Sequence, residues 1–183
     1  MAKLVSKTYG DALFELAVET DSLDMIMEEA QAVSEAFSDN AELLKILTHP
    51  KITPQEKITI VENIFKGRVS ETMLGFLVTV GNKNRYTELE NILAYFLNRV
   101  KEYKKIGVVS VTSATAMTEE QKAQLEAKLL DTTKYESLET DYGTDEALLG
   151  GMIIRIGDRV VDSSIRTKLT NMAKELSKIQ LSK

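Results

Sequence analysis

The chain contains very few residues that interrupt a helix. Its 183 residues include 9 glycines and 2 prolines, whereas these two types make up roughly 12% of average proteins. Both prolines, Pro50 and Pro54, fall within one short connection. Because glycine and proline destabilise a helix interior more than any other residues, this scarcity predicts that most of the chain forms long helices.

Six apolar patterns with helical spacing fill the first 105 residues. In each pattern, apolar side chains recur every three or four residues, as on a helix with one buried face. Thr53–Glu56 is a capping box with proline at the first helical position, and Gly67 and Gly81 follow the next two patterns. The sixth and longest pattern places these residues on one stripe: Leu89, Ile92, Leu93, Phe96, Val100 and Tyr103. The sequence therefore predicts an N-terminal six-helix bundle over residues 1–105.

The first of these helices, expected over Val5–Glu19, has more apolar surface than one core contact needs. Phe14 and Val18 lie outside the main apolar face, so apolar side chains cover more than half of the helix. That face carries Val5, Tyr9, Ala12, Leu13, Leu16 and Ala17. Two interpretations stay open: a central helix packed on two sides, or a second apolar face that binds a partner.

The periodicity changes after Gly107. Val108–Thr112 is short and rich in β-branched residues, which favours a strand. Later, Gly157-Asp158 separates two apolar runs, as a two-residue hairpin turn does. The expected order is strand, helix, strand, strand, strand, helix: Val108–Thr112, a helix opening at the capping box Thr118–Gln121, Tyr135–Tyr142, Met152–Ile156, Val160–Val161, and a helix capped by Ser163 or Ser164. The fold class is therefore mainly α, with a small α/β domain over residues 106–183.

No arrangement of residues points to catalysis. The chain has no cysteine and a single histidine, His49, which excludes thiolate zinc sites and cysteine nucleophiles. No Gly-x-Ser-x-Gly elbow is present, and the glycines lack the spacing of phosphate-binding loops. We therefore expect no catalytic residue, no metal and no cofactor.

The charge distribution limits the possible partners. A net charge of −5 argues against a broad nucleic-acid interface. No apolar run approaches the ~20 residues that cross a bilayer, so we expect no direct membrane insertion. Asp11–Glu42 contains ten acidic residues and no lysine or arginine. This segment is either a solvated helix surface or a patch that steers a basic partner.

Short motifs spread over nearly the whole chain share their order with those of a known family. They are Tyr9–Ala17, Pro50 with Lys57, Phe76-Leu77 with Asn84-Arg85, Val109–Ala114 with Thr118 and Gln121, Leu149–Gly151, Ile156–Asp158, and Val161–Ile165 with Leu169. In this order they resemble the δ subunit of F-type ATP synthase, the family of the oligomycin-sensitivity-conferring protein, in a bacterial form. One departure is Ser163, where the family often has glycine.

The resemblance implies a non-catalytic subunit of the peripheral stalk. Such a subunit links the catalytic head to the membrane proton channel and holds the head static against rotor torque during ATP synthesis. It would lie at the cytoplasmic face of the bacterial cell membrane, attached only through the complex.

The resemblance also implies where partners bind. The N-terminal domain would hold the N-terminal helices of α subunits in a groove between its first and fifth helices, formed by Tyr9, Ala12, Leu13, Leu16, Phe76, Leu77 and Val80. The C-terminal domain would hold the end of the b subunit, through Gly150, Gly151, Asp162, Ile165 and Leu169. For the last helix a second interpretation is favoured on physical grounds: Ile165, Leu169, Met172 and Leu176 are core residues.

The sequence is also compatible with two other classes of function. The first is a two-domain cytosolic scaffold unrelated to the synthase, with the same helical bundle. The second is a small enzyme that uses only carboxylates, which requires two acids of raised pKa in one cleft.

Overall fold

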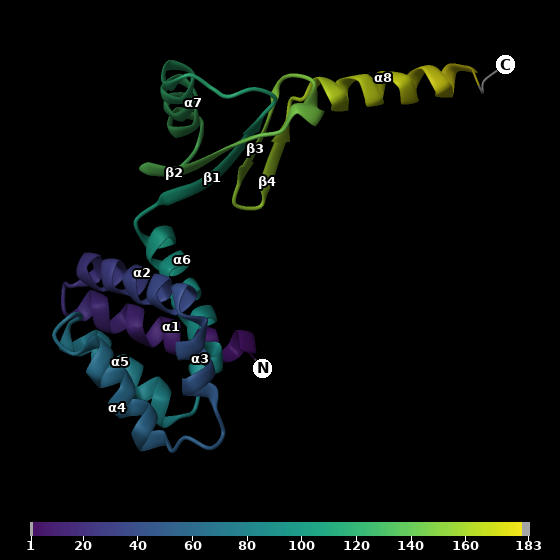
Figure 1. Cartoon of the computed structure of the whole chain (residues 1–183). Coiled ribbons are helices and arrows are strands. Elements are labelled where there is room, and N and C mark those ends of the chain that lie inside the picture. The colour runs from purple at the N-terminus through teal and green to yellow at the C-terminus, as the bar shows by residue number, and fades with distance from the viewer. Residues whose placement is uncertain (1, 181–183) are drawn as a thin grey trace. The chain divides into compact units, whose positions relative to one another are not determined.

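The chain is mainly helical, with one small sheet near its C-terminus, as the sequence predicted. The computed structural model describes the backbone of residues 2–180 and the side chains of residues 4–40 and 42–176. The chain divides into two compact units, Met1–Lys101 and Glu102–Lys183. Figure 1 shows the helices and strands of the two units. Each unit has its own apolar core.

The N-terminal unit is built from helices joined by short connections. They are α1 (Ala2–Glu19), α2 (Leu23–Asp39), α3 (Ala41–Thr48), α4 (Pro54–Phe65), α5 (Glu71–Asn82), the short 3₁₀ helix η1 (Tyr86–Glu88) and α6 (Leu89–Tyr103). The expected capping box at Thr53 and Glu56 opens α4, and the Ser70 hydroxyl accepts a hydrogen bond from the Met73 amide at the start of α5. Local side-chain hydrogen bonds thus set where these helices begin.

The core of this unit surrounds α6. Five of the residues predicted to share a stripe are 0% exposed: Leu89, Ile92, Leu93, Phe96 and Val100. Side chains from the five preceding α-helices pack in the same core, among them Leu13, Ile26, Leu47, Val61 and Leu77. The sixth predicted member, Tyr103, is 61% exposed at the end of α6, so its assignment to the buried stripe is wrong.

Helix α1 approaches α6 through a glycine. A Cβ atom on Gly10 would lie 2.4 Å from Cδ1 of Tyr95, so the two helices can come this close only without a side chain there. The Tyr95 hydroxyl donates to Oδ1 of Asp11 at 3.0 Å. The side of α1 that faces the core is therefore Ser6, Gly10, Leu13 and Ala17, all buried.

A carboxylate on α2 joins that helix to the start of α5. The Ser70 amide donates to Oε1 of Glu29 at 2.6 Å, and the Ser70 hydroxyl donates to Oε2 at 2.7 Å. Hydrogen bonds to a charged acceptor are stronger than neutral ones. Glu29 therefore satisfies an N-terminal donor of α5 and fixes where the helix begins relative to α2.

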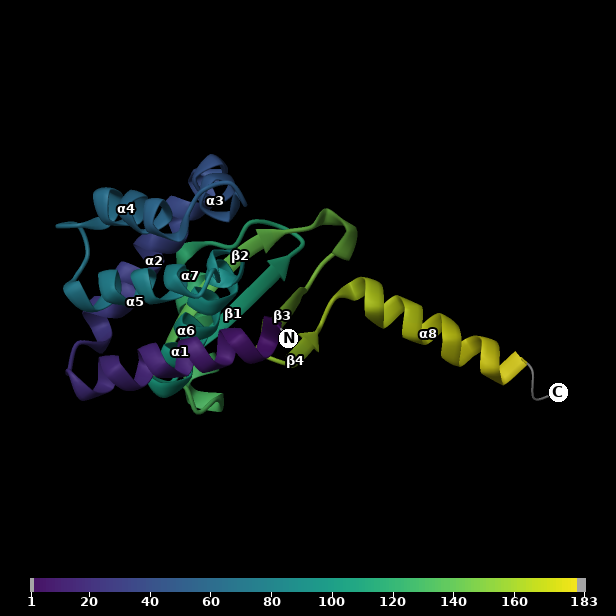
Figure 2. The same cartoon turned by 90° about the horizontal axis from the view of Figure 1, so that it is seen from below.

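The C-terminal unit is a four-stranded sheet with two helices. Its elements are β1 (Ile106–Ser113), α7 (Glu119–Thr132), β2 (Ser137–Thr144), the 3₁₀ helix η2 (Glu146–Leu148), β3 (Met152–Ile156), β4 (Arg159–Asp162) and α8 (Ile165–Gln180). The strand order is β2-β1-β3-β4, with β1 and β2 parallel and the other neighbours antiparallel. Helix α7 connects the parallel pair and lies on one face of the sheet (Figure 1 and Figure 2).

The buried core of this second unit is small. Val109 and Val111 of β1 are fully buried under Leu129 of α7, and partly buried residues such as Ile154 and Ile156 complete the cluster. The predicted two-residue hairpin is confirmed, since Ile156 pairs with Arg159 across the turn. Helix α7 covers one face of this small sheet, and α8 begins outside the buried core.

The contact between Glu29 and Ser70 provides a test of the helical unit. We expect Glu29→Ala to lower the free energy of unfolding by about 1–3 kcal/mol, because it removes two charge-assisted hydrogen bonds. Urea unfolding followed by circular dichroism measures this change. Glu28→Ala is the matched control, since Glu28 is an exposed neighbour on the same helix; equal losses in the two variants would contradict the assignment.

Candidate partner-binding site

A groove runs along the surface of the N-terminal unit between α1 and α5. Its volume is about 520 Å³. The residues that line it are Thr8, Tyr9, Ala12, Leu13, Leu16, Glu71, Thr72, Gly75, Phe76 and Thr79. A Cβ atom on Gly75 would meet nothing within 4 Å, so the floor of the groove is open at this point. The groove is an apolar channel with hydroxyl groups and one carboxylate at its edges.

The groove exists because α1 divides its apolar residues between two faces. Leu13 and Ala17 are 1% and 0% exposed and belong to the core. Leu16 is 41% exposed and lies on the groove side. Two of the core-facing positions of α1 are occupied by the small residues Ser6 and Gly10. Large apolar side chains of α1 therefore also lie on the face that points away from the core.

The groove brings together five of the seven residues expected there. Tyr9, Ala12, Leu13 and Leu16 line it from α1, and Phe76 lines it from α5. The other two predicted residues, Leu77 and Val80, are 0% exposed and lie in the core beneath α5. Both were expected in the groove from the family resemblance, which does not separate the groove-facing side of α5 from its core-facing side.

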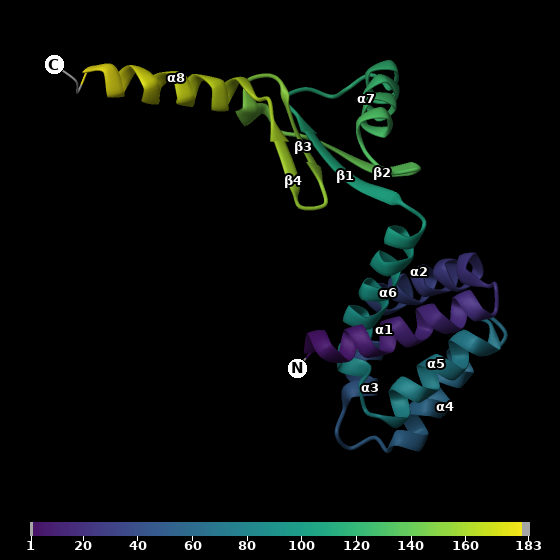
Figure 3. The same cartoon turned by 180° about the vertical axis from the view of Figure 1, so that it is seen from behind.

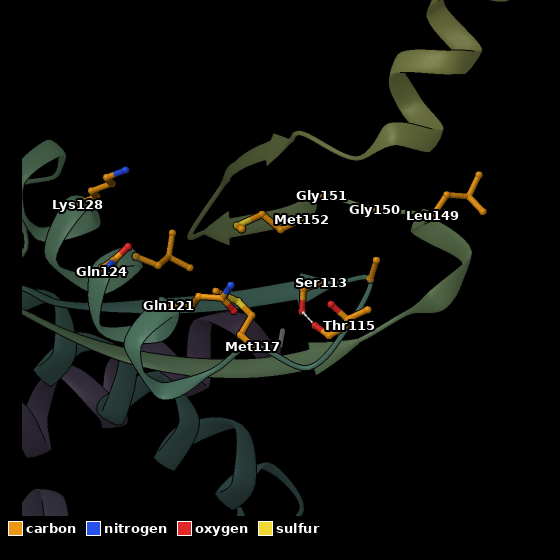
Figure 4. Close-up of a pocket in the computed structure, with 12 residues that line it drawn as sticks. Ser113, Thr115, Met117, Gln121, Gln124, Lys128, Leu149, Gly150, Gly151 and Met152 are labelled. Carbon is orange, nitrogen blue, oxygen red and sulfur yellow. Dashed lines mark hydrogen bonds between the residues drawn. The ribbon is translucent and has the colours of Figure 1, made fainter.

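A second hollow, of about 420 Å³, lies in the C-terminal unit between α7 and the turn that leads into β3 (Figure 4). Its apolar lining includes Met117, Leu125 and Met152. Its polar lining includes two amides and one ammonium from α7: Gln121, Gln124 and Lys128. No acidic side chain lines this pocket, so it suits an apolar group that carries a hydrogen-bonding or negatively charged end.

Two of the residues expected at the stalk contact, Gly150 and Gly151, line this same pocket. The Gly150 carbonyl accepts from the Ile165 amide at 2.9 Å, which joins the pocket to the first turn of α8. Gly151 has a φ of +77°, and a Cβ there would lie 2.5 Å from the Ser163 carbonyl oxygen. This turn therefore requires glycine for packing, whatever binds beside it.

Asp162, also expected at the stalk contact, is positioned to begin α8. Its Oδ1 accepts from the Ser164 amide at 2.8 Å and its Oδ2 accepts from the Thr167 hydroxyl at 2.7 Å. These hydrogen bonds hold the pKa of Asp162 below its usual value, and the bond from Thr167 has the largest effect. The Ser164 hydroxyl accepts from the Thr167 amide, so Ser164 is the capping serine. Ser163 instead donates its hydroxyl to the Met152 carbonyl.

Helix α8 presents an exposed apolar stripe. Ile165, Leu169, Met172 and Leu176 are 45%, 53%, 59% and 65% exposed. The prediction that these four residues are core is wrong, because α8 extends past the small sheet of its own unit in the part of the chain that the structure describes (Figure 3). Their spacing of four, three and four residues is that of a coiled-coil seam. The same apolar spacing occurs on a helix face buried in a core, so the sequence alone does not distinguish the two.

The described residues offer no support for enzyme chemistry. Within residues 2–180, no group of three or more histidine, cysteine, aspartate or glutamate side chains could hold a metal ion. Glu56 and Asp162 have clearly shifted carboxyl pKa values, and both are lowered by hydrogen bonds at helix N-termini. A general acid would need a raised pKa. No helix in the described part of the chain is long and apolar enough to cross a membrane.

The chain is similar to ATP synthase subunits over almost its full length. A family model described as "ATP synthase delta (OSCP) subunit" matches residues 5–176. The ATP synthase subunit delta of Lachnoclostridium phytofermentans is 58% identical over 99% of this chain and 100% of that protein. The same subunit of Desulforamulus reducens is 34% identical over 94% of each chain.

The fold has a counterpart among solved structures. A chain in the cryo-EM structure of the Toxoplasma gondii mitochondrial ATP synthase hexamer superposes with a TM-score of 0.72. The match covers 93% of this chain and 96% of that one, at 17% sequence identity. At this identity the likeness concerns the fold alone.

The hydrogen bonds of Asp162 predict a pH dependence of α8. Because the folded-state pKa of Asp162 is lowered, its stabilisation of the helix start is present above the unfolded pKa and is lost as the pH falls through the folded value. We expect amide hydrogen exchange in the first turn of α8 to accelerate, relative to intrinsic rates, on acidification below about pH 4. In Asp162→Asn this acid-dependent acceleration should disappear; an unchanged acid response in that variant would contradict the assignment.

Proposed function

The chain belongs to the ATP synthase delta (OSCP) subunit family and is a non-catalytic subunit of that complex, and we propose that its two units hold different parts of it. The resemblance of the ordered sequence motifs to this family is thereby confirmed. The alternative of a scaffold unrelated to the synthase is wrong. In this proposal the N-terminal unit is a six-helix domain that binds the catalytic head. The C-terminal unit binds the peripheral stalk.

We propose that the groove between α1 and α5 holds the N-terminal helix of an α subunit. A groove lined by Tyr9, Leu16 and Phe76 suits the apolar face of an amphipathic helix. Exposed acids of α1, such as Glu15 and Glu19, favour a helix whose polar face is basic. The single observation that carries this proposal is the surplus of apolar side chains on α1 outside the core.

The energetics of this groove call for further contacts with the head. Leu13 is 1% exposed before any partner binds, so its burial adds little. Burying three fully exposed apolar side chains at ~1.5–3 kcal/mol each would contribute at most about 9 kcal/mol. Tyr9 and Phe76 are already partly buried against the core, so burying them with Leu16 contributes less. Association itself costs an estimated 4–15 kcal/mol. A single helix in this groove is thus marginal, and stable attachment requires other surfaces of the unit.

We propose that α8 and the adjoining pocket hold the end of the b subunit. The stripe Ile165, Leu169, Met172 and Leu176 provides an unpaired seam with the 4-3 spacing that a second helix fills. The pocket at Gly150 and Gly151 lies directly beside the first turn of this seam. A stalk helix running along α8 could therefore place its end in the pocket, where Lys128 offers a positive charge.

Binding both partners at once would make the chain a tether. The head would be held static against rotor torque, so that proton flow through the membrane sector drives ATP synthesis rather than rotation of the head. The chain would be peripheral to the membrane, on the cytoplasmic face in a bacterium, through the complex alone.

The groove assignment is tested by Leu16→Asp. A carboxylate in the apolar channel should weaken binding to the catalytic head at least about tenfold, because an unpaired charge would be desolvated on binding. Val18→Asp is the matched control, since Val18 is also 41% exposed on α1 and does not line the groove. Calorimetric titration with heads lacking this subunit measures both affinities; equal affinities for the two variants would place the α-subunit helix elsewhere.

The seam assignment is tested by Leu169→Asp. We expect this variant to lose most of its affinity for a soluble fragment of the stalk, whereas binding to the head stays unchanged. Asn171→Asp adds the same charge to the same helix, about 200° away from Leu169 around its axis, and should bind the stalk as the parent chain does. If sedimentation shows that Leu169→Asp still binds the stalk fragment normally, α8 is not the contact.

A further inference from the structure

A small polar cavity in the N-terminal unit lies apart from the α1–α5 groove. It has a volume of about 190 Å³ and is formed where the end of α3, the first turn of α4 and the segment after α5 meet. Thr48, Lys57, Asn84 and Thr87 contribute its polar side chains, and no acidic residue lines it. This volume far exceeds the ~10–15 Å³ that one water molecule needs.

The ammonium group of Lys57 is the unusual feature of this cavity. The Lys57 residue is only 5% exposed, whereas a lysine is almost never this buried unless it is paired. Its Nζ atom donates to Oδ1 of Asn84 at 3.4 Å, a long bond to a neutral acceptor. It forms no ion pair and no other hydrogen bond with the described residues. A buried charge that is compensated so weakly is costly without a counter-charge.

The neighbours of Lys57 add hydrogen-bond donors. Asn84 has a φ of +53° directly after α5, and this left-handed end of the helix fixes the position of its side chain. Because Oδ1 accepts from Lys57, the amide nitrogen of Asn84 is available as a donor. Tyr86, which also lines the cavity, is 2% exposed, and its hydroxyl has no hydrogen-bond partner among the described residues. Burial raises the pKa of Tyr86 to about 12, so this hydroxyl stays protonated.

We propose that this cavity is a binding site for an oxyanion, held by Lys57 and Asn84. One positive charge, amide and hydroxyl donors and no carboxylate form the donor set that a phosphate or carboxylate group requires. The oxyanion has two possible sources: a free ion such as inorganic phosphate, or an acidic side chain of a subunit that contacts this part of the chain. The site is separate from the helix groove, so its occupancy does not depend on the assignment of that groove.

The test uses the full chain, with inorganic phosphate as the probe. Phosphate is titrated against chloride at matched ionic strength, and the backbone amides of Asn84, Tyr86 and Thr87 are followed by NMR. We expect saturable shifts. Lys57→Met should weaken phosphate binding at least about tenfold, because the charge-assisted bond is lost. Lys51→Met removes the same charge from an exposed residue of the nearby α3–α4 connection and should leave the affinity unchanged.

Asn84→Asp tests the same site without removing the lysine, in case Lys57→Met is unstable. Asn84→Asp retains the lysine and places a carboxylate beside it, so the internal pair should exclude phosphate and raise the unfolding midpoint. An aspartate is tolerated at this left-handed backbone position. Absence of saturable shifts in the parent chain, or equal affinities in the parent chain and all three variants, would overturn the oxyanion site.

The source of the oxyanion is read from binding to the catalytic head. If phosphate binds to the parent chain and Lys57→Met leaves head affinity unchanged, the ligand is a free ion. If phosphate binds and Lys57→Met also weakens head binding about tenfold, the natural ligand is an acidic side chain of the head, whose charge-assisted bond is then lost. Both results support an oxyanion site at Lys57.

Discussion

The N-terminal unit depends on the complete burial of one apolar stripe on α6. Leu89, Ile92, Leu93, Phe96 and Val100 are withdrawn from water only because helices pack around them. Helix α1 comes close to α6 at Gly10, where a Cβ would strike the Tyr95 ring. This approach uses small residues of α1 for the core and leaves Tyr9 and Leu16 facing outward. The groove against α5 thus follows from how the core is closed.

In the C-terminal unit, by contrast, the buried core is small and many apolar side chains stay exposed. Helix α7 covers β1 and β2 on one face of the sheet, whereas α8 begins beyond the core and keeps Leu169 and Leu176 more than half exposed. The start of α8 is nevertheless well defined, by Asp162 and Ser164 on one side and the Gly150 carbonyl on the other. A firmly anchored helix with an uncovered seam is suited to binding another helix rather than to completing a core.

Sequence reasoning located features whose causes are local. The capping boxes at Thr53 and Thr118 and the Gly157-Asp158 hairpin each depend on a few adjacent residues, and all three are confirmed. It identified the buried stripe of α6, but not which faces of α1 and α8 are covered, because that depends on neighbours distant in sequence. The family resemblance assigned Leu77 and Val80, which are buried, to the groove. Apolar periodicity overlooked Gly10 as a core contact. It likewise treated the α8 seam as core. Lys57 and Asn84 were noted only as family motifs, and nothing in their spacing revealed a shared cavity.

The central claim is that one chain joins the catalytic head to the peripheral stalk through two different units. Native mass spectrometry of the full chain, mixed with α3β3 heads lacking this subunit and a soluble stalk fragment, tests it most directly. The account predicts a complex with one copy of this chain per head that also carries the stalk fragment, and no complex of head and stalk fragment when the chain is omitted. If the folded chain leaves head and stalk as separate species, or binds both only in alternative complexes, the chain is not the tether.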